Sequence, residues 1–541
     1  MTDASRTVRS AVGIGAITAL SRVVGFVRVL VVAAILGATY LGNAFQSANS
    51  VSNVVFELVA AGALSAVLVP AFVELFEAGD QRGAEEVAGG VLGVAVAGLG
   101  TIALVGMAAS PLLARLLTIG VPDEIAAEQR ALVTFLLLFF LPQIVLYAAG
   151  TVATGVLHAR HRFLAVAAAP MANTIVMVAF LVAFRIATGP DPSLDLTLGQ
   201  QLLLAAAGTG GVVAFCTVLV AACRRTGFDL RPRWRVRDAR VVRALGQAGW
   251  GVVLHSSAGV LLGGAIVAGA AVEGGVIAYQ VAWVFFLAPF AIFAQPIQTA
   301  ILPEWAVEAR DGDRARFGRS VRWALERASL PVLPVSVAMT VLALPAMRIV
   351  SVGRAAEGSG PDLLAAAVAT LALGLVPYAF FLLLARAFYA LGDSRTPGLV
   401  AIGVAVVGAA SLAVGALLTE GTARIAALGL SHTIAHVVGA VVLAVLLARR
   451  IDQPVLSPVL GLMVAVNVAV GLVLWAMVQA GLDRVDGRAG DLVLCAAVAT
   501  VGAALLALAY RVLGVRRRLT VRTEGPEDPA EPDAVPAGGY T

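Results

Sequence analysis

The sequence contains no lysine, so all 38 of its basic residues are arginines. Only 13% of the 541 residues are charged and 60% are hydrophobic, which leaves too little polar surface to cover a soluble domain. The net charge of +5 is small, and we expect it at the faces of a membrane. This excludes nucleic acid as a partner, because nucleic-acid binding requires a basic, solvated surface. The composition therefore predicts a chain that uses lipid as its solvent.

Cysteine is scarce as well. The three cysteines lie in or beside apolar runs, at spacings that fit neither a disulfide framework nor a metal site. His432 and His436 are four residues apart, a spacing that metal ligands on one helix face would have, but the sequence offers no third ligand. The sequence also has no nucleotide-binding loop and no catalytic constellation. We therefore expect no metal, no cofactor and no enzymatic activity.

Long apolar runs dominate what is present. Fourteen runs reach the roughly 17–25 residues that cross a hydrocarbon layer of ~30 Å. The first run is longer than the apolar core of a signal peptide and carries two arginines, so no cleaved leader is expected. The pattern predicts an all-α polytopic membrane protein with 14 transmembrane helices. The runs lie near residues 11–37, 46–73, 87–114, 131–153, 163–186, 199–222, 245–270, 276–302, 328–350, 362–389, 397–418, 425–448, 455–480 and 490–513.

Arginines are distributed unevenly between these spans. If both termini are cytoplasmic, 28 arginines lie on the cytoplasmic side, eight on the opposite side and two within the first span. Positive residues accumulate on the cytoplasmic side of membrane proteins, so this bias predicts that orientation. The abundance of Ala, Val, Gly and Arg is typical of GC-rich bacterial genomes, which points to a bacterial inner membrane. The tail at 516–541 is rich in Pro and acidic residues, and we expect it to be disordered.

An internal repeat relates the two halves of the chain. Residues 65–70, Ser-Ala-Val-Leu-Val-Pro, end the second span, and residues 298–303, Gln-Thr-Ala-Ile-Leu-Pro, end the eighth span 233 positions later. Two copies of six helices cross in the same sense, so we predict two lobes in a parallel repeat with a cavity between them. Two further helices follow the repeat. The predicted parts are a cytoplasmic N-terminus at 1–10, lobes at 11–223 and 245–450, an arginine-rich linker at 224–244, the last two helices at 451–515 and the tail at 516–541.

Charged side chains inside apolar spans identify candidate functional residues, because each costs about 2.5–3.5 kcal/mol to insert. Arg22 and Arg28 lie in the first span, and their directions differ by about 120° on an ideal helix. A guanidinium group binds a diphosphate through paired hydrogen bonds, so we predict that both bind substrate; the alternatives are ion pairing and snorkelling. Glu57 and His255 are candidates for coupling to an ion or for ion pairing, with packing as the alternative for His255.

Three motifs resemble a known family. Residues 21–28, Ser-Arg-Val-Val-Gly-Phe-Val-Arg, together with 33–38, are similar to the first-helix signature of the MurJ/MviN family. Residues 62–65, Gly-Ala-Leu-Ser, resemble the end of that family's second helix. The third motif resembles the family's segment between helices ten and eleven, and its most distinctive residues are Arg386, Tyr389, Asp393 and Pro397. Members of this family are lipid II flippases of the multidrug/oligosaccharidyl-lipid/polysaccharide exporter superfamily.

The resemblance implies a transport mechanism. It implies that two lobes alternately open to either side and carry lipid II, an undecaprenyl-diphosphate-linked peptidoglycan precursor, in a cationic cavity. It further implies that an ion gradient or the membrane potential drives transport, and that the lipid tail lies near the last two helices. The coupling ion is left open. The expected partners are the lipid substrate, membrane lipids and, at the arginine-rich linker, wall-synthesis proteins; contact of this linker with anionic lipid is the alternative.

The sequence departs from the family pattern at four positions. Val29 and Ala61 stand where members of the family often have an acidic residue, and Phe56 and Val284 where they often have an arginine, so half of the expected cationic cluster is missing. This keeps three alternatives open beside lipid II transport. They are transport of another polyprenyl-linked glycan, ion-coupled export of a drug or metabolite, and a scaffold role in wall synthesis without transport.

Overall fold

The computed structural model describes residues 3–56, 63–234 and 249–519, and within these ranges it contains helices and no strands. A helix satisfies its own backbone groups, which lipid cannot do. Glu57, Ala61, part of the linker and the tail from residue 520 lie outside the described residues. The first half comprises α1 (Asp3–Leu36), α2 (Tyr40–Phe56), α3 (Ala63–Glu77), α4 (Gln81–Ala108), α5 (Ser110–Leu117), α6 (Asp123–Phe140), α7 (Gln143–Ala159), α8 (Phe163–Thr188) and α9 (Leu198–Arg225).

The second half comprises α11 (Gly249–Gly269), α12 (Gly275–Pro289), η2 (Phe290–Ala294), α13 (Gln295–Asp311), α14 (Arg314–Val341), α15 (Ala343–Val350), η3 (Gly353–Ala356), α16 (Gly360–Ala372), α17 (Leu375–Ala390), α18 (Arg395–Leu418), α19 (Gly421–Ile451), α20 (Pro458–Leu482), α21 (Gly487–Val512) and α22 (Val515–Arg518). Short breaks divide several predicted spans into two helices.

The described residues include ten helices that are long and apolar enough to cross a membrane, or eleven if α16 and α17, which meet at 42°, form one span. The predicted first, second and seventh spans fall on α1, on α2 with α3, and on α11, which are not among these ten. The chain is therefore an integral, nearly all-helical membrane protein. The total of fourteen spans stays a prediction.

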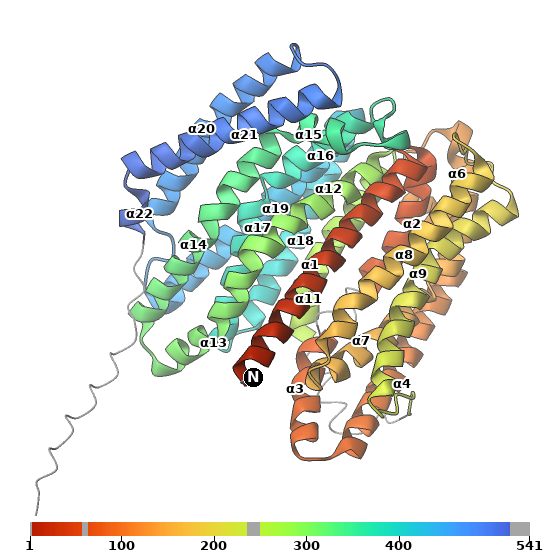
Figure 1. The fold of residues 1–541 in the computed structure, drawn as a ribbon, viewed down its shortest axis with the longest axis horizontal. Coiled ribbons are helices and arrows are strands. Elements are labelled where there is room, and N and C mark those ends of the chain that lie inside the picture. The colour runs from red at the N-terminus through yellow and green to blue at the C-terminus, as the bar shows by residue number, and fades with distance from the viewer. Residues whose placement is uncertain (1–2, 57–62, 235–248, 520–541) are drawn as a thin grey trace, which may run out of the picture.

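The helices form two bundles, which we call the first bundle (α1–α9) and the second bundle (α11–α19). Figure 1 shows them side by side, with α1 running between them and with α20 and α21 along the far edge of the second bundle. Helix α1 packs against α8 of the first bundle and also contacts η3 and α12 of the second. Helix α20 packs on α14, and α21 packs on α15 and α20. The surfaces of α1, α2, α11 and α12 thus form the boundary between the bundles.

Helix boundaries recur along the chain at the offset that the sequence repeat indicates. Helix α4 begins at Gln81 and α14 at Arg314, 233 residues later, and both helices have 28 residues. Their starts are capped alike. Asp80 Oδ1 accepts a hydrogen bond from the Gly83 N–H at 2.8 Å, and Asp313 Oδ1 accepts one from the Arg316 N–H at 2.9 Å. Each cap satisfies a backbone donor in the first helical turn, so the same local signal starts both helices.

The bundles are joined at the end where α1 stops. Asn43 on α2 donates from Nδ2 to the Val272 carbonyl at 2.8 Å and accepts at Oδ1 from the Val276 N–H at 3.0 Å. Glycine permits the close approach here, because a Cβ at Gly42 would lie 2.3 Å from the Ile277 side chain. We call this region the joined end. Asn43 lies in a polar-rich stretch of α2, but its partners could not be identified from the sequence because they lie 229 and 233 residues away.

A second contact at the joined end involves charge. Arg354, in η3 of the second bundle, lies 3.7 Å from the carboxylate of Asp191 in the first bundle, measured from Nε to Oδ1. The same guanidinium donates to the Pro192 carbonyl at 3.1 Å. The Arg354 side chain is 15% exposed and that of Asp191 is 76% exposed, so solvent screens this pair in part.

Candidate functional site

A polar cavity of about 230 Å³ lies between the two bundles. Apolar side chains form most of its wall, and five residues bring charge or amide groups to it. We call it the central cavity. Its lining residues are Arg28, Val29 and Val32 on α1, Phe45, Gln46, Asn49 and Asn53 on α2, Met177 on α8, Leu262 on α11, and Ile277, Gln280, Val281, Trp283 and Val284 on α12.

Arg28 is the charged residue of this lining. The guanidinium has five donors in a planar fork, which matches phosphate oxygens. Among the described residues, no Asp or Glu forms an ion pair with Arg28. Val29 and Val284, which stand at two of the positions where an additional charge was expected from the family pattern, also line the cavity. The described part of the cavity wall therefore carries one positive charge.

Amide side chains form the polar part of the wall. Gln46, Asn49 and Asn53 are spaced three and four residues apart on α2, so they share one helix face. Tyr147 on α7 donates from Oη to Asn53 Oδ1 at 3.2 Å, which orients that amide. Amides both donate and accept hydrogen bonds, so this face suits a ligand rich in hydroxyl and amide groups. The regular spacing of these polar residues in the sequence already predicts one polar face on this helix.

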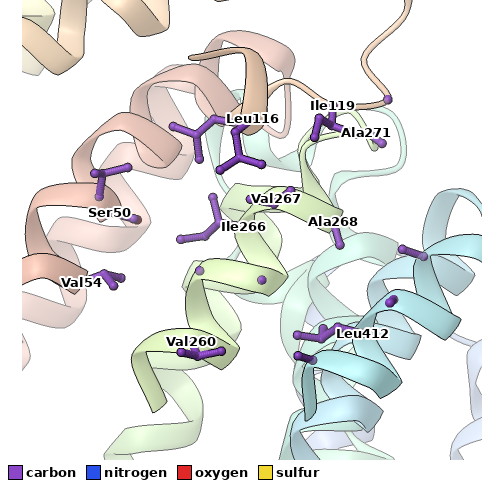
Figure 2. Close-up of a pocket in the computed structure, with 18 of the residues that line it drawn as sticks. Ser50, Val54, Leu116, Ile119, Val260, Ile266, Val267, Ala268, Ala271 and Leu412 are labelled. Carbon is purple, nitrogen blue, oxygen red and sulfur yellow. The ribbon is translucent and has the colours of Figure 1, made fainter. Parts of the chain in front are cut away.

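A larger, apolar cavity of about 790 Å³ lies beside the central cavity, among α2, α5, α11 and α18. Figure 2 shows labelled lining residues from these four helices, including Val54, Leu116, Val260 and Leu412. Ser50 lines this apolar cavity, and its Oγ accepts a hydrogen bond at 2.8 Å from Nε2 of Gln280, which lines the central cavity. This hydrogen bond thus lies between the polar central cavity and the apolar cavity.

The remaining charged candidates within the spans are placed differently. Arg22 lies on α1 with an exposed side chain and is not among the residues that line the central cavity. The structure therefore brings only one of the two predicted arginines to this cavity, and substrate binding by Arg22 stays a prediction. His255 lies on α11, but its side chain is outside the described part of the structure. Glu57 is also outside it, so the expected roles of both residues stay predictions.

The third family motif forms the junction of α17 and α18, away from the central cavity. Asp393 accepts hydrogen bonds from the backbone N–H of Thr396 at 2.9 Å and from its hydroxyl at 2.8 Å. Burial raises the pKa of the Asp393 carboxyl, but these hydrogen bonds and the charge of Arg450 outweigh it, so the net pKa is lowered. Pro397 then lies in the first turn of α18, where a missing N–H costs least.

Arg386 and Tyr389 occupy the last turns of α17. Both side chains are partly buried, and the Tyr389 hydroxyl has no hydrogen-bond partner among the described residues. Neither residue lines the central cavity. The geometry of this motif is that of a tight connection between two helices. Within the described ranges, no group of three or more His, Cys, Asp or Glu side chains is arranged to hold a metal ion.

The chain matches known proteins over most of its length. The family model described as "Lipid II flippase MurJ" matches residues 32–487. A probable lipid II flippase MurJ of Rhizobium tropici is 28% identical over 420 residues, which cover 76% of each chain. The probable lipid II flippase MurJ of Haemophilus influenzae is 27% identical over 407 residues, covering 70% of this chain and 75% of that relative.

Solved structures share the fold. A lipid II flippase MurJ in an inward closed conformation superposes with a TM-score of 0.73 at 16% identity, covering 93% of this chain and 99% of that one. An inward-facing transporter of the multidrug resistance MATE family, from the MOP superfamily, gives a TM-score of 0.64 at 18% identity, with 80% and 94% of the chains covered. At these identities the similarity establishes the fold alone. Because the family model covers most of the sequence, this chain belongs to the lipid II flippase MurJ family.

Proposed function

We propose that this protein flips lipid II from the cytoplasmic to the outer leaflet of the bacterial inner membrane and has no catalytic activity of its own. The proposal rests on the position of Arg28, an arginine within an apolar helix. It lines a cavity between the two bundles together with the amides of Gln46, Asn49 and Asn53. The guanidinium would bind the diphosphate, and the amides would bind the sugar and peptide groups. Membership of the family supports the same substrate.

Alternating access is the mechanism that the cavity size favours. A volume of about 230 Å³ is smaller than the ~300–1,000 Å³ of ordinary ligand pockets. A disaccharide-pentapeptide headgroup therefore requires the bundles to separate around Arg28. The joined end would stay closed while the opposite end admits the headgroup, and the order would then reverse. The chain has no ATP-binding motif, so an ion gradient or the membrane potential would supply the free energy.

The proposed architecture is fourteen spans, with six in each lobe and two added at the C-terminal end. The lobes would correspond to 11–223 and 245–450, and both termini would be cytoplasmic. The recurrence of α4 and α14 at an offset of 233, each with an Asp cap, supports the repeat. The excess of arginines in the segments assigned to the cytoplasm supports the orientation.

A second candidate function is transport of a different polyprenyl-linked glycan. Val284 favours it, because this uncharged residue lines the central cavity at a position where the family often has an arginine. A cavity with fewer cations suits a substrate with less negative charge on its headgroup.

Complementation tests the proposal. Bacteria depleted of their own lipid II flippase would express this chain, and growth would be scored together with the exposure of lipid II on the outer face. We expect rescue by the wild type and failure of Arg28→Ala at equal protein level. Correct membrane insertion without rescue by the wild type would contradict lipid II transport and direct the search to other polyprenyl-linked glycans.

A further inference from the structure

Two histidines lie in contact inside the second bundle. His432 and His436, one turn apart on α19, are each 1% exposed, and their ring centroids are 4.2 Å apart. Nδ1 of His436 is 2.9 Å from the backbone carbonyl of His432 and is positioned to donate to it. The chain has only five histidines, so finding two of them paired in the interior of an apolar bundle calls for a physical reason.

The pair is enclosed by aromatic rings from α12 and α17. The ring centroid of His432 lies 5.1 Å from that of Trp283 and 5.1 Å from that of Phe286. The ring of His436 lies 5.1 Å from Tyr378. All three contacts are edge-to-face, with ring planes 69° to 83° apart. The pair is therefore surrounded by aromatic rings, among which a charged imidazolium is disfavoured without water.

The titratable surroundings of the pair are simple. Tyr378, on α17, is the titratable side chain recorded in ring contact with it. From α11, α12, α14, α16 and α18, which also pack against α19, the described contacts bring no Asp, Glu or Arg to either imidazole. Both ring nitrogens of His432 are buried without a hydrogen-bond partner among the described residues. A neutral imidazole here leaves its polar atoms unused, and a charged one has no counter-ion in this conformation.

Trp283 connects this pocket with the central cavity. It lines the cavity that contains Arg28, and it also contacts His432. It stacks on Phe286 with the ring planes 22° apart and the centroids 5.3 Å apart. A rearrangement of the cavity wall that displaces Trp283 would therefore open a path for water to the histidine pair.

We propose that His432 and His436 form a proton-binding site whose occupancy is coupled to the shape of the central cavity. The inference rests on the proposed function in one respect, namely that the bound proton is the ion that drives transport. One proton passes from a hydronium ion to a free ring nitrogen, forming an N–H bond and leaving water. The charge is disfavoured in the sealed pocket, so proton binding favours conformations in which Trp283 moves and water enters.

Tryptophan fluorescence tests the site without any substrate. The full-length protein in lipid nanodiscs would be titrated from about pH 8 to about pH 5, the range in which imidazole ordinarily changes charge. We expect a fluorescence change that is lost in His432→Phe, in His436→Phe and in Trp283→Phe. It should persist in His158→Phe, the matched control, which removes a histidine at the end of α7. His432→Gln replaces His432→Phe if the latter does not insert.

Transport separates this proposal from the proposed function. Lipid II flipping would be measured in proteoliposomes with and without an imposed pH gradient. We expect a gradient-dependent rate in the wild type and in His158→Phe, and loss of that dependence in the His432 and His436 variants. If both His variants still flip lipid II in a gradient-dependent way and still show the fluorescence titration, the proton site is contradicted but lipid II transport is not. If the fluorescence titration is lost in both His variants but the wild type does not flip lipid II, the proton site is supported and lipid II transport is contradicted.

Discussion

The two ends of the interface between the bundles are held together by different kinds of contact. At the joined end, Asn43 exchanges two hydrogen bonds with backbone groups beside α12, and Arg354 reaches Asp191. Nearer the start of α1, the described side chains include an edge-to-face pair, Phe26 with Phe285, with centroids 4.8 Å apart. Hydrogen bonds require a narrower geometry than aromatic contacts do. From the described side chains, we therefore expect the bundles to part more easily near Phe26 than at the joined end.

Arg28→Ala should have the largest effect, because it removes the cation from the region where the bundles part. Hydrogen bonds to charged groups contribute about 1.5–3 kcal/mol, which corresponds to a loss of roughly 10- to 160-fold in flipping rate. The rate would be measured in proteoliposomes with purified lipid II. Arg22→Ala is the matched control, since Arg22 is exposed outside the cavity lining. Equal losses in both variants would instead support the sequence-based prediction that Arg22 also binds substrate, whereas full activity of Arg28→Ala would contradict recognition in the central cavity.

Asn43→Ala should unlock the joined end. The substitution leaves the Val276 N–H and the Val272 carbonyl without their partner, at a cost of about 1–3 kcal/mol to the closed arrangement. Spin labels placed at either side of the joined end should report a larger population of separated bundles.

Asn467→Ala is the control for Asn43→Ala. It removes a buried Asn that bonds Met463 and Tyr510, within and between α20 and α21, far from the interface. An unchanged distance distribution in Asn43→Ala would mean that packing, rather than hydrogen bonding, closes this end.

Arg354→Gln should act in the same direction but more weakly. Its partner Asp191 is largely exposed, and partly exposed pairs typically contribute about 0.2–1 kcal/mol. The same spin-label distances should shift slightly at low salt, and raising the salt concentration should reduce the difference from the wild type. A shift as large as that of Asn43→Ala would reverse the ranking of the two contacts.

Asp393→Asn should have the smallest effect, because it lies outside the interface. The pKa of Asp393 is lowered in the folded protein, so its ionised form stabilises the fold above its unfolded pKa of about 3.9. This contribution disappears as the pH falls through the lower, folded value. The melting temperature of the variant should therefore be slightly below that of the wild type at pH 7, and the difference should shrink as the pH falls below the unfolded pKa and through the folded one.

More of the helical architecture than of the candidate site could be predicted from the sequence. Apolar run length reports a membrane helix directly, because each helix satisfies its own hydrogen bonds, and the Asp80 and Asp313 caps start α4 and α14 from purely local signals. The site depends on which faces of distant helices meet. The 120° between Arg22 and Arg28 was compatible with one wide cavity, but the observed cavity includes only Arg28.

Contacts between helices explain what could not be predicted. Asn43 and Gln280 are polar residues within helices, and their hydrogen-bond partners lie more than 200 residues away in sequence. His432 and His436 were predicted to share a helix face, but the aromatic residues around them come from α12 and α17. Periodicity along one helix carries no information about such neighbours, which are set by the packing of the bundles.

The single positive charge in the described wall of the central cavity determines how the membrane potential acts on a loaded transporter. With Arg28 as the charged residue of the described cavity wall, a bound diphosphate is only partly neutralised, and the loaded complex would carry net negative charge. An inside-negative potential pushes such a complex outward, with about 2.3 kcal/mol for each charge that crosses 100 mV. A cavity with fewer arginines would bind the diphosphate less tightly, but the loaded complex would carry more net negative charge, so the membrane potential would drive its outward movement more strongly.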